Sequence, residues 1–592
     1  MIYKDKTKSI DERVEDLMQR MTVDEKIAQL YCANAYGGVP VIDSKEEKLK
    51  NGIGTISYLN DSLTGNNKKD IETLNAIQKY LVEETRLGIP GLVHNEGIAG
   101  AQIPGATTFP QSLNMAATWE PRLAKKMGEV VKKQLMAYGI RAVHSPLFDL
   151  GRDPRWGRIG ETYGEDPYLV SQMGVSYVRG VQGDDEVMAT AKHFVGYGNA
   201  EGGINGGAQQ IAERKLLDTY CVPFEAAIHE AGLKAVMNSY GIVNEEAVST
   251  SKWLLTDILR HELGFKGLVV ADYGSISHAR TRYRVAKDDK EAAVLALKAG
   301  MDVEQPGDAC YQFLKEALEG GEIGESELDR SLKRILTMKF KLGLFENPYH
   351  IGTFDTEIAS QKAADLSKEI AKKSIVMVKN EAGTLPIKKG LKIALIGPSA
   401  DTKANFFGGY SAVGSADTKS SDFDKSEEDH RLKVAYSSAI TEYKETFEEY
   451  GIMYDEEPSA EQKEIIMAMI KQNYTQTESK YGSAESFIDT YYPDCQTIKQ
   501  VMENTYGQEN IIYAKGCEIK QSIESGVEAA QVAVSQADIV VAVLGGKESM
   551  IDAQATSGEN RDNSNIDLEK PQIELMQAIY TCGKPVVAVI VD

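Results

Sequence analysis

Short apolar segments alternate with longer helical segments over residues 1–345. Stretches with apolar residues at i, i+3 and i+4 are clearest over residues 10–30 and 216–232, and they predict amphipathic helices. Repeated strand–helix units predict a parallel sheet, and about seven of them predict a TIM-type (β/α) barrel. The predicted strands are GIGTISYL (52–59), IPGLVHNE (89–96), IRAVHSPLFDL (140–150), VMATAKHF (187–194), LKAVMNSY (233–240), GLVVADYG (267–274) and AGMDVEQP (299–306).

Polar or ionisable side chains stand at the carboxyl ends of these predicted strands. Such ends meet at one mouth of a barrel, where barrels of this type place their chemistry, so we expect a ring of functional groups there. The alternative is that each side chain caps the helix that follows it. The residues are His94, Glu96, Asp149, Lys192, His193, Asn238, Tyr240, Asp272, Asp302 and Glu304.

A second α/β unit follows the barrel pattern. Residues 346–372 read as a linker and a helix, and residues 373–592 as an α/β sandwich domain with a polar insertion at about 414–493. The chain stops inside an apolar segment that reads as a core strand, which predicts a C-terminally truncated, incomplete second domain. The expected start and strands of this unit are SIVMVKNEAGTLPI (374–387), LKIALIGPSAD (391–401), ADIVVAVLGG (537–546) and GKPVVAVIVD (583–592).

Charge and composition narrow the class of protein. The net charge of −22, from 66 basic and 88 acidic residues, repels nucleic acid and anionic membranes, so we expect neither as a partner. The N-terminus has no apolar core of a signal peptide, which predicts a cytoplasmic protein. The six cysteines are scattered without C-x-x-C, so neither a disulfide framework nor a metal site is indicated. No nucleotide-binding glycine motif is present, and we expect no cofactor.

Cleavage of a glycosidic bond needs two carboxyl groups on opposite sides of the reacting carbon. One acts as nucleophile or base, and the other donates a proton to the leaving oxygen. Asp272 at the end of a buried strand suits the first role. Glu559 in the loop SGENRD (557–562) suits the second, and Glu548 in GGKESM is the competing acid.

Several motifs together resemble glycoside hydrolase family 3. The resemblance covers most of residues 10–400 and again 505–592, and it implies a barrel followed by an α/β sandwich. It also implies a retaining, exo-acting β-glycosidase with a small oligosaccharide or glycoside as substrate. The motifs are SPLFDLGRDPRWGRIGETYGEDP (145–167), TTFPQSLNMAATWEP (107–121), AKHFVGYGNAEGG (191–203) and VMNSYGIVNEEAVSTSKWLLTDILRHELGFKGLVVADYGSI (236–276).

The resemblance also implies roles for single residues. Asp272 corresponds to the nucleophile and Glu559 to the acid/base. Tyr273 stands where the family usually has tryptophan, which changes the sugar platform. Arg158 and Lys192 are expected to bind sugar hydroxyls and to keep Asp272 ionised. The positions that correspond to sugar-binding residues are Glu96, Arg158, Lys192, His193 and Tyr240.

The sequence leaves open the identity of the terminal sugar and two other classes of protein. Glu96, where glucosidases of the family tend to have aspartate, favours a pentose, but glucose and xylose both remain candidates for the terminal β-linked residue. A metal-dependent barrel hydrolase would need clustered histidines and carboxylates, whereas the eight histidines are dispersed. A catalytically weak sugar-binding chain would need neither Asp272 nor Glu559. Homo-oligomerisation is possible.

Overall fold

The computed structural model describes residues 1–592 except 35–44, 59–65, 350–356, 359, 382, 417–458, 461–482, 551, 553 and 592. Most of the predicted polar insertion at 414–493 therefore lies outside the described residues. In the described part, no helix is both long enough and apolar enough to cross a membrane.

The first sheet is parallel, and its strands follow one another in chain order. A single pair, Val270 with Val303, adds the segment 299–306 beside β10. From that segment the Glu304 N–H donates to the carbonyl oxygen of Leu30 at 2.9 Å, and the Cys32 N–H donates to Gly307 at 3.3 Å. These bonds join the last strand position to the first, as in the predicted barrel. The strands are β1 (Cys32–Asn34), β2 (Thr55–Ser57), β3 (Leu92–Asn95), β4 (Ala142–Val143), β5 (Met188–Phe194), β7 (Ala235–Asn238) and β10 (Leu268–Val270).

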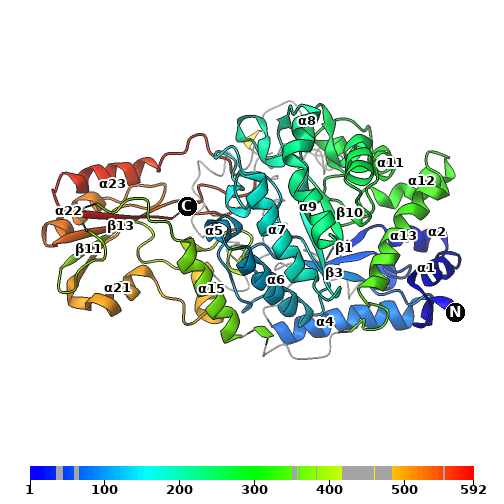
Figure 1. Cartoon of the computed structure of the whole chain (residues 1–592), viewed down its shortest axis with the longest axis horizontal. Coiled ribbons are helices and arrows are strands. Elements are labelled where there is room, and N and C mark those ends of the chain that lie inside the picture. The colour runs from blue at the N-terminus through cyan, green and yellow to red at the C-terminus, as the bar shows by residue number, and fades with distance from the viewer. Residues whose placement is uncertain are drawn as a thin grey trace.

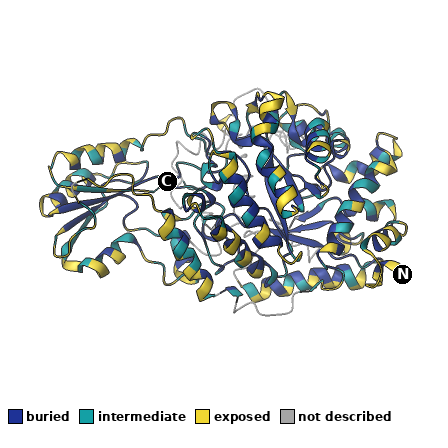
Figure 2. Ribbon diagram, viewed as in Figure 1, coloured by how far each residue is buried: buried dark blue, intermediate teal, exposed yellow. Residues whose placement is uncertain are grey.

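Helices cover the barrel from outside, with their apolar faces on the buried strands (Figures 1 and 2). The long pattern over residues 10–30 forms two helices, because Thr22 caps the second one and exchanges capping-box bonds with Glu25. The helices named below are α1 (Ile10–Met18), α2 (Val23–Ala28), α6 (Pro121–Met136), α7 (Pro167–Gln182), α9 (Val222–Ala231), α11 (Asp289–Ala299), η10 (Trp253–Glu262) and α13 (Glu325–Lys341).

The second sheet is a four-stranded parallel sheet in the order β12, β11, β13, β14. Helices α22 (Gly526–Ser535) and α23 (Lys570–Tyr580) pack on one face, and α21 (Ile498–Tyr506) packs on the other, which gives the predicted α/β sandwich. In Figure 1 this smaller unit lies beside the barrel, with the C-terminus between the two. The strands are β11 (Ile393–Ile396), β12 (Ile511–Ala514), β13 (Ile539–Gly545) and β14 (Val586–Val591).

Helix α15 (Gln361–Ser374) connects the two units and lies against α5 (Ser112–Ala117) of the barrel. Residues 374–387, where the second unit is expected to start, contain no described strand. Residues 375–381 have no regular structure, and the side chains of Ile375 and Val378 are 78% and 91% exposed. A strand needs a neighbour that pairs with its backbone groups, and no described strand runs beside this segment.

Candidate active site

Asp272 lies two residues beyond the end of β10, at the mouth of the barrel. Its backbone N–H donates to the side-chain oxygen of Asn238 at the end of β7, at 2.9 Å, and its Oδ1 accepts from the Tyr273 N–H at 2.8 Å. Its Oδ2 has no hydrogen-bond partner among the described residues and lies 3.5 Å from Nε2 of His193. One carboxylate oxygen is thus held in place and the other is available to a ligand.

Burial, with a smaller contribution from the nearby charge of Glu559, raises the pKa of Asp272 to about 7. Lys192 and Arg158 act in the opposite direction, as expected from the sequence, but burial outweighs both cations. That these two residues keep Asp272 ionised stays a prediction.

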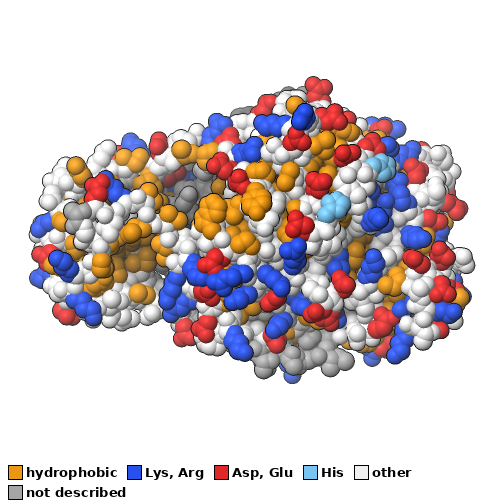
Figure 3. Space-filling view, viewed as in Figure 1, with side chains coloured by type: hydrophobic (Ala, Val, Ile, Leu, Met, Phe, Trp, Pro, Cys, Tyr) orange, Lys and Arg blue, Asp and Glu red, His pale blue; other side chains and the backbone are white. Residues whose placement is uncertain are grey.

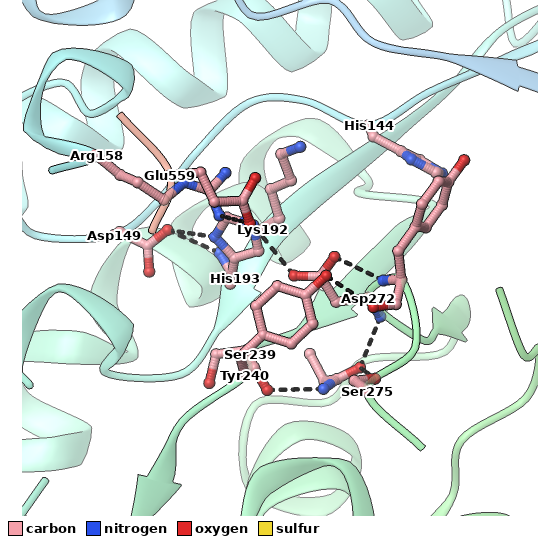
Figure 4. A network of polar contacts seen from close by, with 12 residues as sticks. His144, Asp149, Arg158, Lys192, His193, Ser239, Tyr240, Asp272, Ser275 and Glu559 are labelled. Atoms are coloured by element: carbon pink, nitrogen blue, oxygen red, sulfur yellow. Dashed lines mark hydrogen bonds and ion pairs between the residues drawn. The ribbon is translucent and has the colours of Figure 1, made fainter. Parts of the chain in front are cut away.

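His193 connects Asp272 to a second buried carboxylate (Figure 4). The Nδ1 atom of His193 lies 2.8 Å from Oδ2 of Asp149, and the backbone N–H of His193 donates to the same oxygen at 3.0 Å. Burial raises the pKa of Asp149 to about 7 and lowers the pKa of His193 well below its usual value. Asp149 thus fixes the orientation of the imidazole whose other nitrogen faces Asp272.

Lys192 and Glu96 form a buried ion pair between the ends of β5 and β3. The ammonium group lies 3.0 Å from both carboxylate oxygens. Burial raises the pKa of Glu96 despite this cation, and His144 Nδ1 lies 3.8 Å from Oε1. A charged donor and a charged acceptor therefore stand side by side.

Arg158 is fully buried and reaches both units of the chain. Its guanidinium forms two bonds of 2.7 Å with the carboxylate of Glu161 and lies 3.2 Å from Oε1 of Glu559. Sequence reasoning did not single out Glu161, although it lies three residues after Arg158 in the strongest motif. Its buried carboxylate neutralises Arg158 and fixes the direction of the guanidinium.

A loop of the second unit delivers Glu559 to the barrel mouth. The Gly558 N–H donates to the carbonyl oxygen of Gly157 at 2.9 Å. The two carboxylate oxygens of Asp562 accept from the Gly157 N–H at 2.9 Å and from the Asn205 N–H at 2.7 Å. Asn205 also donates to Asn560 at 2.9 Å. These four bonds anchor both sides of Glu559 on barrel loops.

Tyr410, also from the second unit, is a site residue that sequence reasoning missed. Its hydroxyl donates to Oε2 of Glu559 at 2.5 Å. Its ring centre lies 4.9 Å from the ammonium of Lys192 and 5.3 Å from the guanidinium carbon of Arg158. The available signal was an aromatic residue after two glycines, in the loop that follows a buried strand.

Glu548, the competing acid, is engaged elsewhere at the junction of the two units. Its Oε2 accepts from the side chain of Gln111 at 2.5 Å, and its Oε1 accepts from the Gly409 N–H at 3.2 Å. Burial raises the pKa of Glu548 to about 7. The charge of Glu559, and not that of Glu548, is among the main influences on the pKa of Asp272.

The two tyrosines predicted from the sequence line the site next to Asp272. The Tyr240 hydroxyl donates to the backbone oxygen of Tyr273 at 2.9 Å. The Tyr273 hydroxyl lies 2.6 Å from Oγ of Ser57 and 2.7 Å from Nε2 of His94. The ring at position 273 is thereby fixed by its hydroxyl, an anchor that tryptophan would lack.

Two members of the expected ring do not point into the mouth. Asp302 binds Arg260 and Arg334 at 2.7 Å each, which lie in the helix layer. Glu304 accepts from the backbone N–H groups of Cys310 and Tyr311, at 2.9 and 2.6 Å, and so caps the next turn. Capping, the alternative considered from the sequence, therefore holds for Glu304. Among the described residues, no group of three or more His, Cys, Asp or Glu side chains is arranged to hold a metal ion.

The family of the chain is shown by comparison with known proteins. Residues 22–338 match the glycosyl hydrolase family 3 N-terminal domain, and residues 375–592 match the C-terminal domain of the same family. The chain belongs to glycosyl hydrolase family 3. Both domains are represented, so the expectation of a truncated chain is not borne out.

Individual relatives carry two different names. The chain is 33% identical to a beta-xylosidase of Formosa agariphila over 86% of the chain and 63% of the relative. It is 28% identical to a periplasmic beta-glucosidase of Salmonella typhimurium over 98% of the chain and 68% of the relative. A solved structure of beta-glucosidase from Listeria innocua in complex with isofagomine superposes with a TM-score of 0.76. Its identity is 27%, over 98% of this chain and 69% of that one. The chain thus spans roughly two thirds of the length of these proteins.

Proposed function

We propose that the protein is a retaining, exo-acting β-glycosidase that removes a terminal β-linked glucosyl or xylosyl residue. The family and the names of the relatives support a β-glycosidase. The observation that carries the finer proposal is the pairing of two carboxyl groups from different units. Asp272 has a free Oδ2 at the barrel mouth, and Glu559 is held above it by a docked loop.

In this mechanism Asp272 attacks the anomeric carbon while Glu559 gives its proton to the departing glycosidic oxygen. The bond from the anomeric carbon to that oxygen breaks, and a glycosyl ester with Asp272 forms. Glu559, now a carboxylate, takes a proton from water, whose oxygen displaces Asp272 and restores the enzyme. The sugar retains its anomeric configuration because two inversions occur.

The remaining polar groups fit the binding of a single sugar ring. Lys192 and Arg158 offer charged donors, and Glu96 offers a charged acceptor. Each cation is already paired with a carboxylate. The hydroxyl groups of the sugar would therefore contact ion pairs whose charges balance, and not unpaired buried charges. A neutral sugar is the ligand that such a network suits.

The test is to trap the glycosyl ester. A 2-deoxy-2-fluoro-β-glycoside with a good leaving group should label the protein once per chain, and peptide mass spectrometry should find the sugar on Asp272. Product analysis by NMR in the first minutes should show the β-anomer. Label on another carboxylate, or the α-anomer as first product, would overturn the proposed mechanism.

Two variants separate the two roles. Asp272→Ala should abolish turnover of every glycoside. Glu559→Ala should slow unactivated glycosides by roughly 10²–10⁴-fold and aryl glycosides with good leaving groups much less, because the latter need little acid assistance. Added azide should restore turnover of the aryl substrate by Glu559→Ala, with a β-glycosyl azide as product. The same pattern in Glu548→Ala would transfer the acid role to that residue.

The sugar is tested by comparing nitrophenyl β-xyloside with nitrophenyl β-glucoside. Glu96 is held by Lys192, so its longer side chain is fixed in the site. We expect xyloside preference, and Glu96→Asp should move the ratio of kcat/KM towards glucoside. A wild-type preference for glucoside would assign the selectivity to other residues, with Tyr273 as the next candidate.

The other expectations remain proposals. We propose a small oligosaccharide or glycoside as the only partner needed, with neither nucleic acid nor membrane, and with self-association possible. Cytoplasmic location stays a prediction, since one relative is periplasmic by name. A chain that binds sugar without turnover is the alternative function, and the trapping experiment distinguishes it.

A further inference from the structure

A cavity of about 380 Å³ lies on the outside of the barrel, remote from the site described above. Helix η10, the turn before β10 and helix α13 form its walls. Lys266 of this turn stands at the amino end of β10, whereas Asp272 follows the carboxyl end of that strand. The lining residues are Thr256, Arg260, His261, Phe265, Lys266, Arg330 and Arg334.

Four of these side chains are permanent cations, and they have one buried carboxylate between them. Asp302 binds Arg260 and Arg334 at 2.7 Å each. Arg330 and Lys266 form no ion pair among the described residues. Positive charge around the cavity therefore exceeds negative charge. This is unusual in a chain whose net charge is −22.

The arginines also hold unused hydrogen-bond donors. The side chain of Arg260 is only 7% exposed, yet its buried Nε has no hydrogen-bond partner in the described part of the protein. The same is true of the buried Nε of Arg330. A buried guanidinium donor without an acceptor costs free energy, and so does a cluster of like charges. An anion in the cavity would offset the cluster of like charges.

We propose that this cavity is a binding site for a small phosphate dianion, either free phosphate or a phosphate monoester. Guanidinium groups bind phosphate through paired N–H donors, and three of them converge here. Lys266 at the exposed rim supplies a point charge, and the ring of Phe265 lies against Arg260, with 5.6 Å from the guanidinium carbon to the ring centre. The cavity is near the lower limit of small-molecule sites, which suits a ligand of this size.

Bound phosphate would stabilise the fold, because it neutralises charge that α13 and η10 otherwise bring together. Asp257 and Lys252 complete the charged surroundings: Asp257 lies 3.6 Å from Nδ1 of His261 and 3.1 Å from Lys252. The proposal does not depend on the glycosidase assignment, since none of these residues contacts Asp272 or Glu559 in the described structure.

The experiment is a thermal-unfolding titration of the full chain with sodium phosphate, against sodium chloride of equal ionic strength. Wild type should show a saturable rise in Tm with phosphate and a smaller, non-saturating change with chloride. Lys266→Gln should raise the half-saturating phosphate concentration severalfold, and Lys266→Gln with Arg330→Gln at least tenfold. The control Lys333→Gln removes one charge from an exposed position of α13 and should titrate like wild type.

A parallel titration with glycerol 2-phosphate identifies the source of the phosphate group. Tighter binding of the ester assigns the site to an organic phosphate, and tighter binding of inorganic phosphate assigns it to the free ion. The proposal is overturned if Tm depends on ionic strength alone, or if Lys266→Gln and the double variant both titrate like wild type. Because Lys266 is exposed and makes no described ion pair, its variant keeps the test valid if the double variant does not fold.

Discussion

At the residue scale, the carboxylates of the candidate site differ in which of their oxygens are bound and by which residues. Asp272 keeps one oxygen unbound, whereas both oxygens of Glu559 are engaged, by Arg158 and by Tyr410. Among the described contacts, Asp149 is bonded to His193, and Glu161 is bonded to Arg158. The two carboxylates assigned to chemistry are thus surrounded by others that orient the cations and the imidazole.

The Tyr410 hydroxyl provides a residue-scale prediction. It holds Oε2 of Glu559, so Tyr410→Phe should let the carboxyl group turn away from the glycosidic oxygen. We expect kcat/KM for an unactivated disaccharide to fall about tenfold, as is typical when a general acid is misplaced, and kcat/KM for a nitrophenyl glycoside to change little. Steady-state kinetics with both substrates measure this difference. Tyr220→Phe, which removes a hydroxyl outside the site, is the control, and an equal loss on both substrates would contradict the role.

The pKa of Asp272 predicts how stability depends on pH. The folded-state pKa of about 7 lies above the ordinary value of 3.8, so the folded protein binds this proton more tightly than the unfolded chain. Its contribution to stability is present at low pH and is lost as pH rises from about 4 to about 7. Asp272→Asn removes the buried charge, so we expect it to be more stable than wild type by about 2–4 kcal/mol at pH 8 and by much less at pH 4.

Chemical unfolding of wild type and Asp272→Asn at the two pH values measures this effect. Asp218→Asn serves as the control, because its side chain is 62% exposed and its effect should not change with pH in this way. A stability gain that is equal at pH 4 and pH 8 would show that burial of the charge is not its cause.

At the element scale, the pattern of apolar segments was sufficient to predict the barrel. A strand buried on both faces appears in the sequence as a short, continuous apolar run. This pattern missed β1 and β12, which have three and four residues and little pattern of their own. Asp272 and Glu559 could be predicted because each lies in a local sequence motif. Tyr410, by contrast, was missed because its role depends on a contact with a residue 149 positions away.

The loop that carries Glu559 gives the prediction at this scale. A Cβ atom at Gly157 would lie 2.1 Å from the backbone oxygen of Arg561 and 2.2 Å from that of Gly558. Gly157→Ala should therefore displace the loop while the barrel stays folded. Turnover of unactivated glycosides should fall by roughly 10²-fold, as when a general acid is removed, with a much smaller loss on activated ones.

Gly324→Ala is the matched control for this variant, because the nearest atom to its Cβ would be 3.7 Å away, an ordinary contact. Circular dichroism should show the same secondary structure for both variants and wild type. Wild-type activity in Gly157→Ala would mean that the docking of this loop on Gly157 does not position Glu559.

At the scale of the whole molecule, catalysis as proposed needs both units, yet each unit has a hydrophobic core of its own. The barrel core is one large cluster, whereas the described part of the second unit has three small clusters, two of them on opposite faces of its four-stranded sheet. Figure 3 shows apolar side chains gathered on the surface of the smaller unit and near its junction with the barrel. A smaller core buries a smaller share of its surface, so the sandwich should be the less stable unit.

This difference predicts that activity is lost before the barrel unfolds. All three tryptophans, Trp119, Trp156 and Trp253, lie in the barrel, so their fluorescence reports on that unit. In urea, hydrolysis of an unactivated glycoside should decline at a lower midpoint than tryptophan fluorescence, because unfolding of the sandwich removes Glu559 while Asp272 stays in place. In the gap between the two midpoints, azide should restore turnover of a nitrophenyl glycoside. Coincident midpoints without azide rescue would show instead that the contacts of Asp562 and Arg158 make the two units unfold as one.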